Sequence, residues 1–224
     1  NASDQRLMYL GRTHQHFHNI EAIRNCEENG IRPSFNLMLF DPDCSVEDVA
    51  TTIDFAETVH HLPWNVCRTE IYSGTPLLRA LEAENRLTGD YRNFGYEMRD
   101  PVCEIMFRIL RVSFHERAFA VSSLLNKLIS ISFARQAHEA FFPGEATDNI
   151  SRSVDDLLSE AHLDTVKELR IALDFSLTHH HKTAAEIQDF AVKSAVRINH
   201  NNRYFYTKFR ELWVLLNARG AALY

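Results

Sequence analysis

The sequence has few of the residues that mark several classes of protein. Its 224 residues include only 7 glycines and 6 prolines, which excludes collagen-like and linker-like chains. So few glycines also disfavour a nucleotide-binding fold built on glycine-rich phosphate loops. The best apolar stretch, residues 118–133, is interrupted by Asn126 and Lys127 and is too short to span a bilayer. With no signal peptide at the start, we expect a cytoplasmic protein without a membrane partner.

Basic residues are outnumbered by acidic ones. There are 24 lysines and arginines against 30 aspartates and glutamates, which gives a formal net charge of -6. A basic footprint for nucleic acid is therefore lacking at the level of the whole chain, and we expect no nucleic-acid partner. Hydrophobic residues nevertheless make up 45% of the sequence, which is typical of a globular protein with a real core and not of a disordered chain.

Cysteine and histidine give no clear metal site. The four cysteines, Cys26, Cys44, Cys67 and Cys103, are far apart and form no CxxC pair, so reduced thiols are favoured. Histidines alternate at residues 14–18, at a predicted helix start where alternate side chains do not converge. A second run, residues 179–181, falls at a predicted helix end, where cations suit the helix dipole. We assign no metal ligand, although these runs leave a metal-dependent hydrolase as the weakest of three functional alternatives.

The first half of the chain, residues 1–100, alternates between helix and strand signals. In chain order these are a helix at 17–29, an apolar strand at 35–40, a helix at 45–62, a strand at 65–72 and a short helix at 77–87. Ser45 and Thr75 are the predicted caps of the second and third helices. Because sequential strands joined by helices usually pair side by side, the pattern predicts two βα units with parallel strands.

The second half, residues 101–224, has no strand signal. Apolar spacing predicts a long helical stretch at 102–142 that ends at Pro143-Gly144, and then a helix or a broken pair of helices up to residue 177. A capping box, Thr183 with Glu186, opens a last helix, with a break predicted near residues 199–202. We therefore expect an antiparallel helical bundle here and a mostly helical protein overall.

The predicted strand at 65–72 carries polar side chains at alternate positions. Arg68, Glu70 and Tyr72 are spaced by two and would share one face of a strand. If the strand belongs to a barrel, that face lines the lumen; the alternative is a solvated outer face.

Four segments of the first half follow one another in a recognisable order. They are Asn1-Ala2-Ser3-Asp4 with Leu10-Gly11-Arg12, residues 22–30, the strand and turn from Phe35 to Asp43, and Glu70-Ile71-Tyr72-Ser73-Gly74-Thr75-Pro76-Leu77. Together they resemble the fourth-strand end, the following helix, the fifth strand and the sixth strand with its G-T-P-L helix in radical S-adenosylmethionine enzymes. The resemblance is closest to the subgroup with an upstream cobalamin-binding domain.

The resemblance implies a fold and a set of site residues. The fold is a partial TIM-like α/β barrel segment of two or three parallel strands at 1–100, followed by an all-α helical domain at 101–224. In this family S-adenosylmethionine is cleaved reductively on a [4Fe–4S] cluster, and the resulting radical abstracts hydrogen from the substrate. Arg12 would pair with the methionine carboxylate, Asn36 and Met38 would face the cofactor in the lumen, and Glu70 and Tyr72 would be the catalytic residues near the nucleoside or substrate.

The sequence also departs from the family pattern. The CxxxCxxC motif that binds the cluster is absent, and Asp41-Pro42-Asp43 stands where many members have a glycine-rich turn. We therefore expect a carboxy-terminal fragment of an oxidoreductase or methyltransferase that is inactive and free of cofactors on its own. Its partners would be the upstream barrel half and the cobalamin-binding domain of the same parent, together with a small-molecule substrate. Open strand edges would also permit a homo-oligomer.

A second alternative belongs to a different class. The helical half could be an interaction or substrate-gating module, with the two βα units serving only as its packing partner. The residues upstream of Asn1 discriminate between these alternatives, because a CxxxCxxC motif there would favour the enzyme.

Overall fold

The computed structural model describes residues 3–9, 13, 15–178 and 183–221. Before residue 87, the described part of the first half forms four helices and two strands. In chain order these are α1 (Asp4–Tyr9), α2 (His16–Glu28), β1 (Phe35–Phe40), α3 (Val46–Thr58), β2 (Trp64–Arg68) and α4 (Pro76–Ala83). The predicted order of helix, strand, helix, strand and helix is confirmed from α2 to α4, whereas α1 was not predicted.

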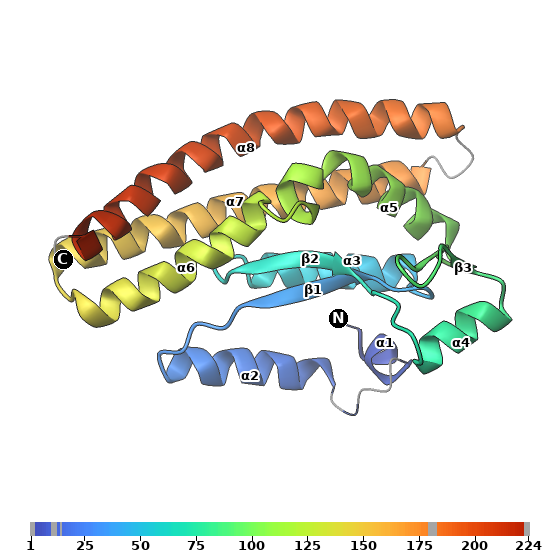
Figure 1. Cartoon of the computed structure of the whole chain (residues 1–224), viewed down its shortest axis with the longest axis horizontal. Helices are drawn as coiled ribbons and strands as arrows, with labels where there is room; N and C mark the ends of the chain where they lie inside the picture. The colour runs from blue at the N-terminus through green and yellow to red at the C-terminus, as the bar shows by residue number, and fades with distance from the viewer. Residues whose placement is uncertain (1–2, 10–12, 14, 179–182, 222–224) are drawn as a thin grey trace.

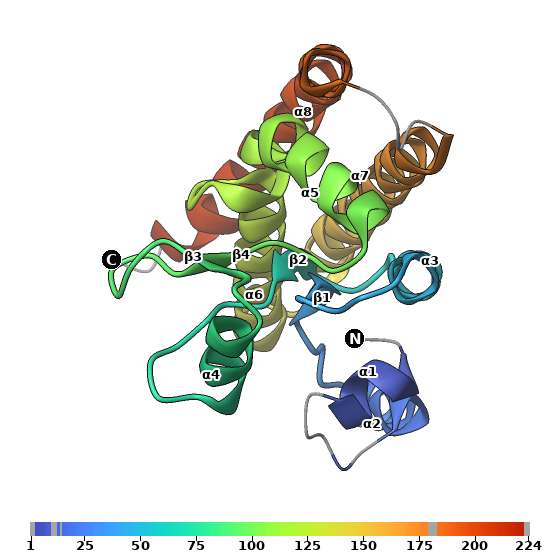
Figure 2. The ribbon, with the colours of Figure 1, turned by 90° about the vertical axis from the view of Figure 1, so that its right-hand side faces the viewer.

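The first half ends with a short β-hairpin of β3 (Leu87–Thr88) and β4 (Gly95–Tyr96), which was not predicted. The described second half is helical and consists of α5 (Pro101–Ser113), the π-helix η1 (His115–Phe119), α6 (Leu124–Phe141), α7 (Glu145–Thr178) and α8 (Ala184–Ala221). Figure 1 shows α5 to α8 on one side of the β1–β2 pair and α1 and α2 on the other, and Figure 2 shows the same layers from the end. No helix in the described ranges is long and apolar enough to cross a membrane.

The predicted pairing of the two main strands is confirmed. β1 and β2 are parallel neighbours, with Asn36 opposite Asn65 and Met38 opposite Cys67. Within the described ranges they form a two-stranded sheet. Leu37 and Leu39 are buried, whereas Asn36 is exposed. One face of β1 therefore belongs to the core, and the other carries its polar side chain outward.

Local sequence signals fix where the helices begin. The Ser45 hydroxyl accepts from the Asp48 amide, and the Asp48 carboxylate accepts from the Ser45 amide, so the predicted capping box opens α3. Thr75 caps α4, whose first residue is Pro76. The predicted capping box of Thr183 with Glu186 precedes α8. These three predictions are confirmed.

The second strand is shorter than predicted, and this corrects the expected positions of two site residues. β2 ends at Arg68, so Glu70 and Tyr72 lie on the segment after it. The Thr69 amide still donates to the Phe40 carbonyl at 2.8 Å, but the register shifts between Met38 and Phe40. The chain then turns at residues 72–75, where Gly74 has a φ of 80°. The predicted alternation of Arg68, Glu70 and Tyr72 along one strand face is therefore wrong.

The helical half differs from the prediction in two places. The stretch 102–142 is divided by η1 and a turn. Of the two alternatives expected up to residue 177, the single helix is found, since α7 has 34 residues without a break. α8 runs through residues 199–202 without the predicted break. Asn202 accepts there from Nε of the buried Arg117 at 2.5 Å. The polar side chain of Asn202 therefore makes a buried contact between α8 and η1, and it does not interrupt the helix.

The turn after β1 is held by arginines. Asp41 is fully buried and accepts from Nε of Arg6 at 3.0 Å, and a second nitrogen of Arg6 completes the ion pair. The next carboxylate, Asp43, pairs with Arg86 at 2.6 Å and with Arg99 at 3.0 Å. Both carboxylates of the turn Asp41-Pro42-Asp43 are therefore paired, because a buried charge needs a partner.

Candidate functional site

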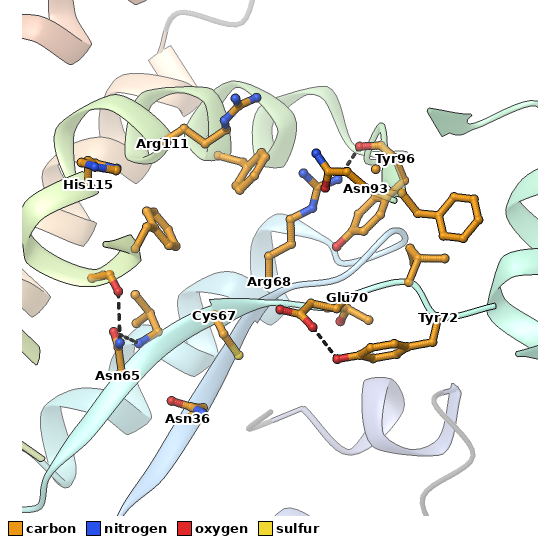
Figure 3. Close-up of a pocket in the computed structure, with 18 of the residues that line it drawn as sticks. Asn36, Asn65, Cys67, Arg68, Glu70, Tyr72, Asn93, Tyr96, Arg111 and His115 are labelled. Atoms are coloured by element: carbon orange, nitrogen blue, oxygen red, sulfur yellow. Dashed lines mark hydrogen bonds between the residues drawn. The ribbon is translucent and has the colours of Figure 1, made fainter. Parts of the chain in front are cut away.

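A large polar cavity lies along β2 and the segment that follows it. Its volume is about 1090 Å³. Its walls come from β1 and β2, residues 69–73, the hairpin at 91–96, α5, η1 and the start of α6. Residues far apart in sequence therefore meet here (Figure 3). The cavity opens where β2 gives way to a loop, which is where parallel α/β proteins place ligands.

Arg68 is the most strongly positioned cation of the cavity. Its guanidinium Cζ lies 3.6 Å from the ring centroid of Tyr96 and 4.2 Å from that of Phe107. One terminal nitrogen donates to the Tyr96 carbonyl. Its Nε is buried and, within the described residues, has no hydrogen-bond partner. Two aromatic rings thus fix the charge of Arg68, while part of its donor capacity stays unused.

The α5 helix adds further polar groups on the same side. Arg111 lines the cavity with its Cζ 6.0 Å from the Phe107 centroid. His115 follows four residues later, at the first position of η1, and is exposed. Residues 107, 111 and 115 are each four apart, so one helix face carries them. A π-helical turn is rare and is often found at functional sites.

Asn65 anchors the floor of the cavity to its wall. Its side-chain nitrogen donates to the Ala118 carbonyl at 3.1 Å and to Oδ1 of Asn126 at 2.9 Å. Its own Oδ1 accepts from the Val66 amide at 2.8 Å. Every hydrogen bond of this buried amide therefore links β2 to η1 or α6, or braces the strand itself.

Glu70 and Tyr72 form a pair at the mouth of the cavity. The Tyr72 hydroxyl donates to Oε2 of Glu70, and both side chains are exposed. This hydrogen bond raises the pKa of the Tyr72 phenol, because it stabilises the protonated form next to a negative charge. Figure 3 shows the two side chains pointing toward each other. Among the described residues, Arg68 and Glu70 form no ion pair, because Arg68 contacts the aromatic rings of Tyr96 and Phe107 instead.

The structure brings several of the residues predicted from the sequence together. Asn36, Glu70 and Tyr72 line the cavity, as does Arg68. Met38 lies beside it: its sulfur accepts from the hydroxyl of Thr69, a cavity residue, at 2.9 Å. Arg12, the predicted partner of the methionine carboxylate, lies outside the described residues, and so do the histidines at 179–181.

Sequence reasoning missed the contributions of the helical half and of the hairpin. Arg111 and His115 come from α5 and η1, and Asn93 and Tyr96 come from the hairpin, for which no strand was predicted from the sequence. A signal for the first pair was present in the spacing of Phe107, Arg111 and His115. The hairpin strands have two residues each, which is too short for a period to be read.

The cysteines carry no reactive site of their own in the described structure. All four are free thiols. Cys67 lines the cavity, and burial raises the pKa of its thiol, so the neutral form dominates near neutral pH. Within the described ranges, no three His, Cys, Asp or Glu residues gather where they could hold a metal ion.

Comparisons with protein-family models, curated proteins and solved structures give no match to this chain.

Proposed function

We propose that this chain is the carboxy-terminal part of a radical S-adenosylmethionine enzyme, and that its cavity forms one side of the chamber where cofactor and substrate meet. The observation that carries the proposal is the position of the cavity. It lies where the second of two parallel strands ends, and it is lined by Asn36, Glu70 and Tyr72, three residues that the family resemblance assigns to the chamber. Active sites of barrel enzymes lie at this end of their strands.

The arrangement of β1 supports an incomplete barrel. β1 and β2 form the whole parallel sheet of the described chain, and the polar residue Asn36 is exposed on the face that its register partner Asn65 shares. Upstream strands of the parent would extend the sheet beside β1 and would turn that face toward the lumen. In the absence of those upstream strands, the unpaired edge of β1 could also pair with a second copy of the chain.

The residues of this chain fit S-adenosylmethionine but do not fit an iron–sulfur cluster. An iron–sulfur cluster needs several thiolates in one place, and within the described ranges no three Cys, His, Asp or Glu side chains gather at one site. Its ligands would therefore come from the upstream part of the parent. A nucleoside with a methionine tail needs hydrogen-bonding groups and room, which the cavity offers.

Each cavity residue has its own role in this proposal. Asn36 offers an amide on the floor, and Tyr72 offers a hydroxyl that Glu70 holds in place. Glu70 would accept a hydrogen bond from a ribose or substrate hydroxyl, and Met38 would support the wall through Thr69. The bound cofactor and cluster would supply the radical chemistry, with cobalamin as a further group if the upstream domain is present. The residues of this chain bind, orient and exclude water.

The helical half has a supporting role. α5, η1 and the start of α6 line the cavity, so this part of the helical half forms the cover of the chamber (Figure 3). We place the parent in the cytoplasm, where reduced thiols and a reduced cluster are maintained.

The test uses the full-length parent protein. After anaerobic reconstitution and reduction, we expect iron and sulfide near the stoichiometry of one cluster and release of 5'-deoxyadenosine from S-adenosylmethionine. Glu70→Gln should lower that release or the substrate turnover about tenfold or more, equivalent to roughly 1.4 kcal/mol. Glu82→Gln is the matched control, because Glu82 is exposed on α4. A parent that holds no iron and releases no 5'-deoxyadenosine would overturn the proposal.

A further inference from the structure

The cavity contains a local excess of positive charge in an acidic protein. Three arginines, Arg68, Arg92 and Arg111, line it, together with one carboxylate, Glu70. The formal net charge of the whole chain is -6. Most arginines elsewhere have carboxylate partners, as Arg197 has in Glu168 at 2.6 Å and Arg108 in Glu104 at 2.9 Å. Within the described ranges, no carboxylate lies within ion-pair distance of the three cavity arginines.

Two of these cations are held around one aromatic ring. The Cζ atoms of Arg68 and Arg111 lie 4.2 and 6.0 Å from the centroid of Phe107, which is buried. The rings of Phe107 and Tyr96 hold the Arg68 guanidinium in place before any ligand binds. Its Nε is buried, so the terminal nitrogens carry the donors that can face a ligand. A guanidinium fixed in this way matches the oxygens of a carboxylate or a phosphate.

We infer that the substrate of this cavity carries an anionic group, a carboxylate or a phosphate, that is bound between Arg68 and Arg111. The inference rests on the proposed function, because it takes the ligand to be the substrate of the parent enzyme. The amide of Asn93 and the imidazole of His115 add hydrogen-bonding groups around the same space. The neutral part of the substrate would then extend along β2 toward Glu70 and Tyr72.

Anion binding can be measured on this chain without iron or cofactor. Isothermal titration with inorganic pyrophosphate and with succinate, at constant ionic strength, should show saturable binding of at least one of them. Arg111→Gln should weaken that binding at least tenfold. Arg108→Gln is the matched control, since Arg108 lies one turn earlier on α5 and pairs with Glu104. A preference for pyrophosphate assigns a phosphate, and a preference for succinate assigns a carboxylate.

A second variant distinguishes loss of the anion site from loss of the fold. Arg68→Lys keeps the charge but loses the planar fork, so it should also weaken binding, while circular dichroism reports the fold. The inference is overturned if neither anion binds, or if Arg111→Gln binds as tightly as the unchanged chain.

The anion could instead be the carboxylate of the cofactor, and the full-length parent distinguishes the two sources. Binding of the preferred anion should persist with saturating S-adenosylhomocysteine, and competition would overturn the inference. Arginine-dependent anion binding by a parent that releases no 5'-deoxyadenosine would reject the proposed function but keep the anion site. Release of 5'-deoxyadenosine by a parent that binds neither anion would support the proposed function and reject the anion site.

Discussion

The imidazole of His162 in α7 stacks on the indole of Trp64 in β2, with ring centroids 4.1 Å apart and ring planes 25° apart. Nδ1 and Nε2 of His162 each lie 3.0 Å from a backbone carbonyl oxygen, that of His60 and that of Trp64 respectively. The Trp64 ring nitrogen donates to the Val59 carbonyl at 3.2 Å. Because a neutral imidazole carries one N–H, it donates to one of these two carbonyls. A residue from the helical half thus contacts the backbone of the segment that leads into the cavity strand.

This contact predicts a pH dependence of stability. Burial lowers the pKa of His162 to about 4, from an ordinary value of 6.5. Because the unfolded chain takes up the proton first, this residue's contribution to the free energy of unfolding is complete above pH 6.5. It is lost as the pH falls toward 4, by up to about 3 kcal/mol. Urea denaturation at pH 7 and pH 4.5 measures the loss. His162→Gln should reduce the difference between the two pH values, and an unreduced difference would assign it to other groups.

The Asn65 network predicts a specific loss of stability. Asn65→Asp keeps the shape but removes the donor to the Ala118 carbonyl and to Asn126, and it buries a charge. The expected loss is about 1–3 kcal/mol, measured by denaturant unfolding. Asn36→Asp is the matched control, because Asn36 is the register partner of Asn65 in β1 and is exposed. Equal losses in the two variants would contradict a special role of the buried amide.

The Glu70–Tyr72 pair predicts a change in phenol titration. Glu70→Gln removes the negative acceptor, so the pKa of Tyr72 should fall back toward its ordinary value of 10. Alkaline titration followed by phenolate absorbance, with Tyr72→Phe to identify the contribution of this residue, checks the shift. Because both side chains are exposed, the melting temperature should hardly change. A titration identical to that of the unchanged chain would show that the pair does not persist in solution.

The buried Arg117 predicts the largest destabilisation. Its guanidinium donates to Asp164 at 2.7 Å and to Thr165 at 2.8 Å, besides Asn202 at 2.5 Å. Arg117→Met leaves these groups without their donor and should cost about 3–5 kcal/mol. Arg108→Met breaks an exposed pair on α5 and should cost less than about 1 kcal/mol. Thermal and urea unfolding of both variants measure the contrast, and similar losses would reject the role of the network.

Much of the fold can be read from local signals in the sequence. The strand at 35–40 is a continuous apolar run, and Ser45, Thr75 and Thr183 cap their helices as expected. The end of β2 could not be read, because it depends on the register shift opposite Met38 and Phe40. That shift is a property of the strand pair and not of either segment alone.

The candidate site was predicted only on its strand side. Asn36, Glu70 and Tyr72 could be named because the family resemblance covers residues 1–101. Arg111 and His115 lie in the helical half, and only tertiary packing brings them to the cavity. The contacts of Arg68 could not be predicted either, because only tertiary packing places Tyr96 and Phe107 beside its guanidinium.

The buried side chains of both halves form a single hydrophobic cluster that extends from Leu37 in β1 to Leu216 in α8. α7 packs against α3 of the first half as well as against α5, α6 and α8. A chain with one shared core is expected to unfold cooperatively in one transition, because neither half can lose its packing alone. α2 has no buried residue, so it can open locally at little cost. Limited proteolysis should therefore cut near α2 long before it separates residues 35–100 from the helices.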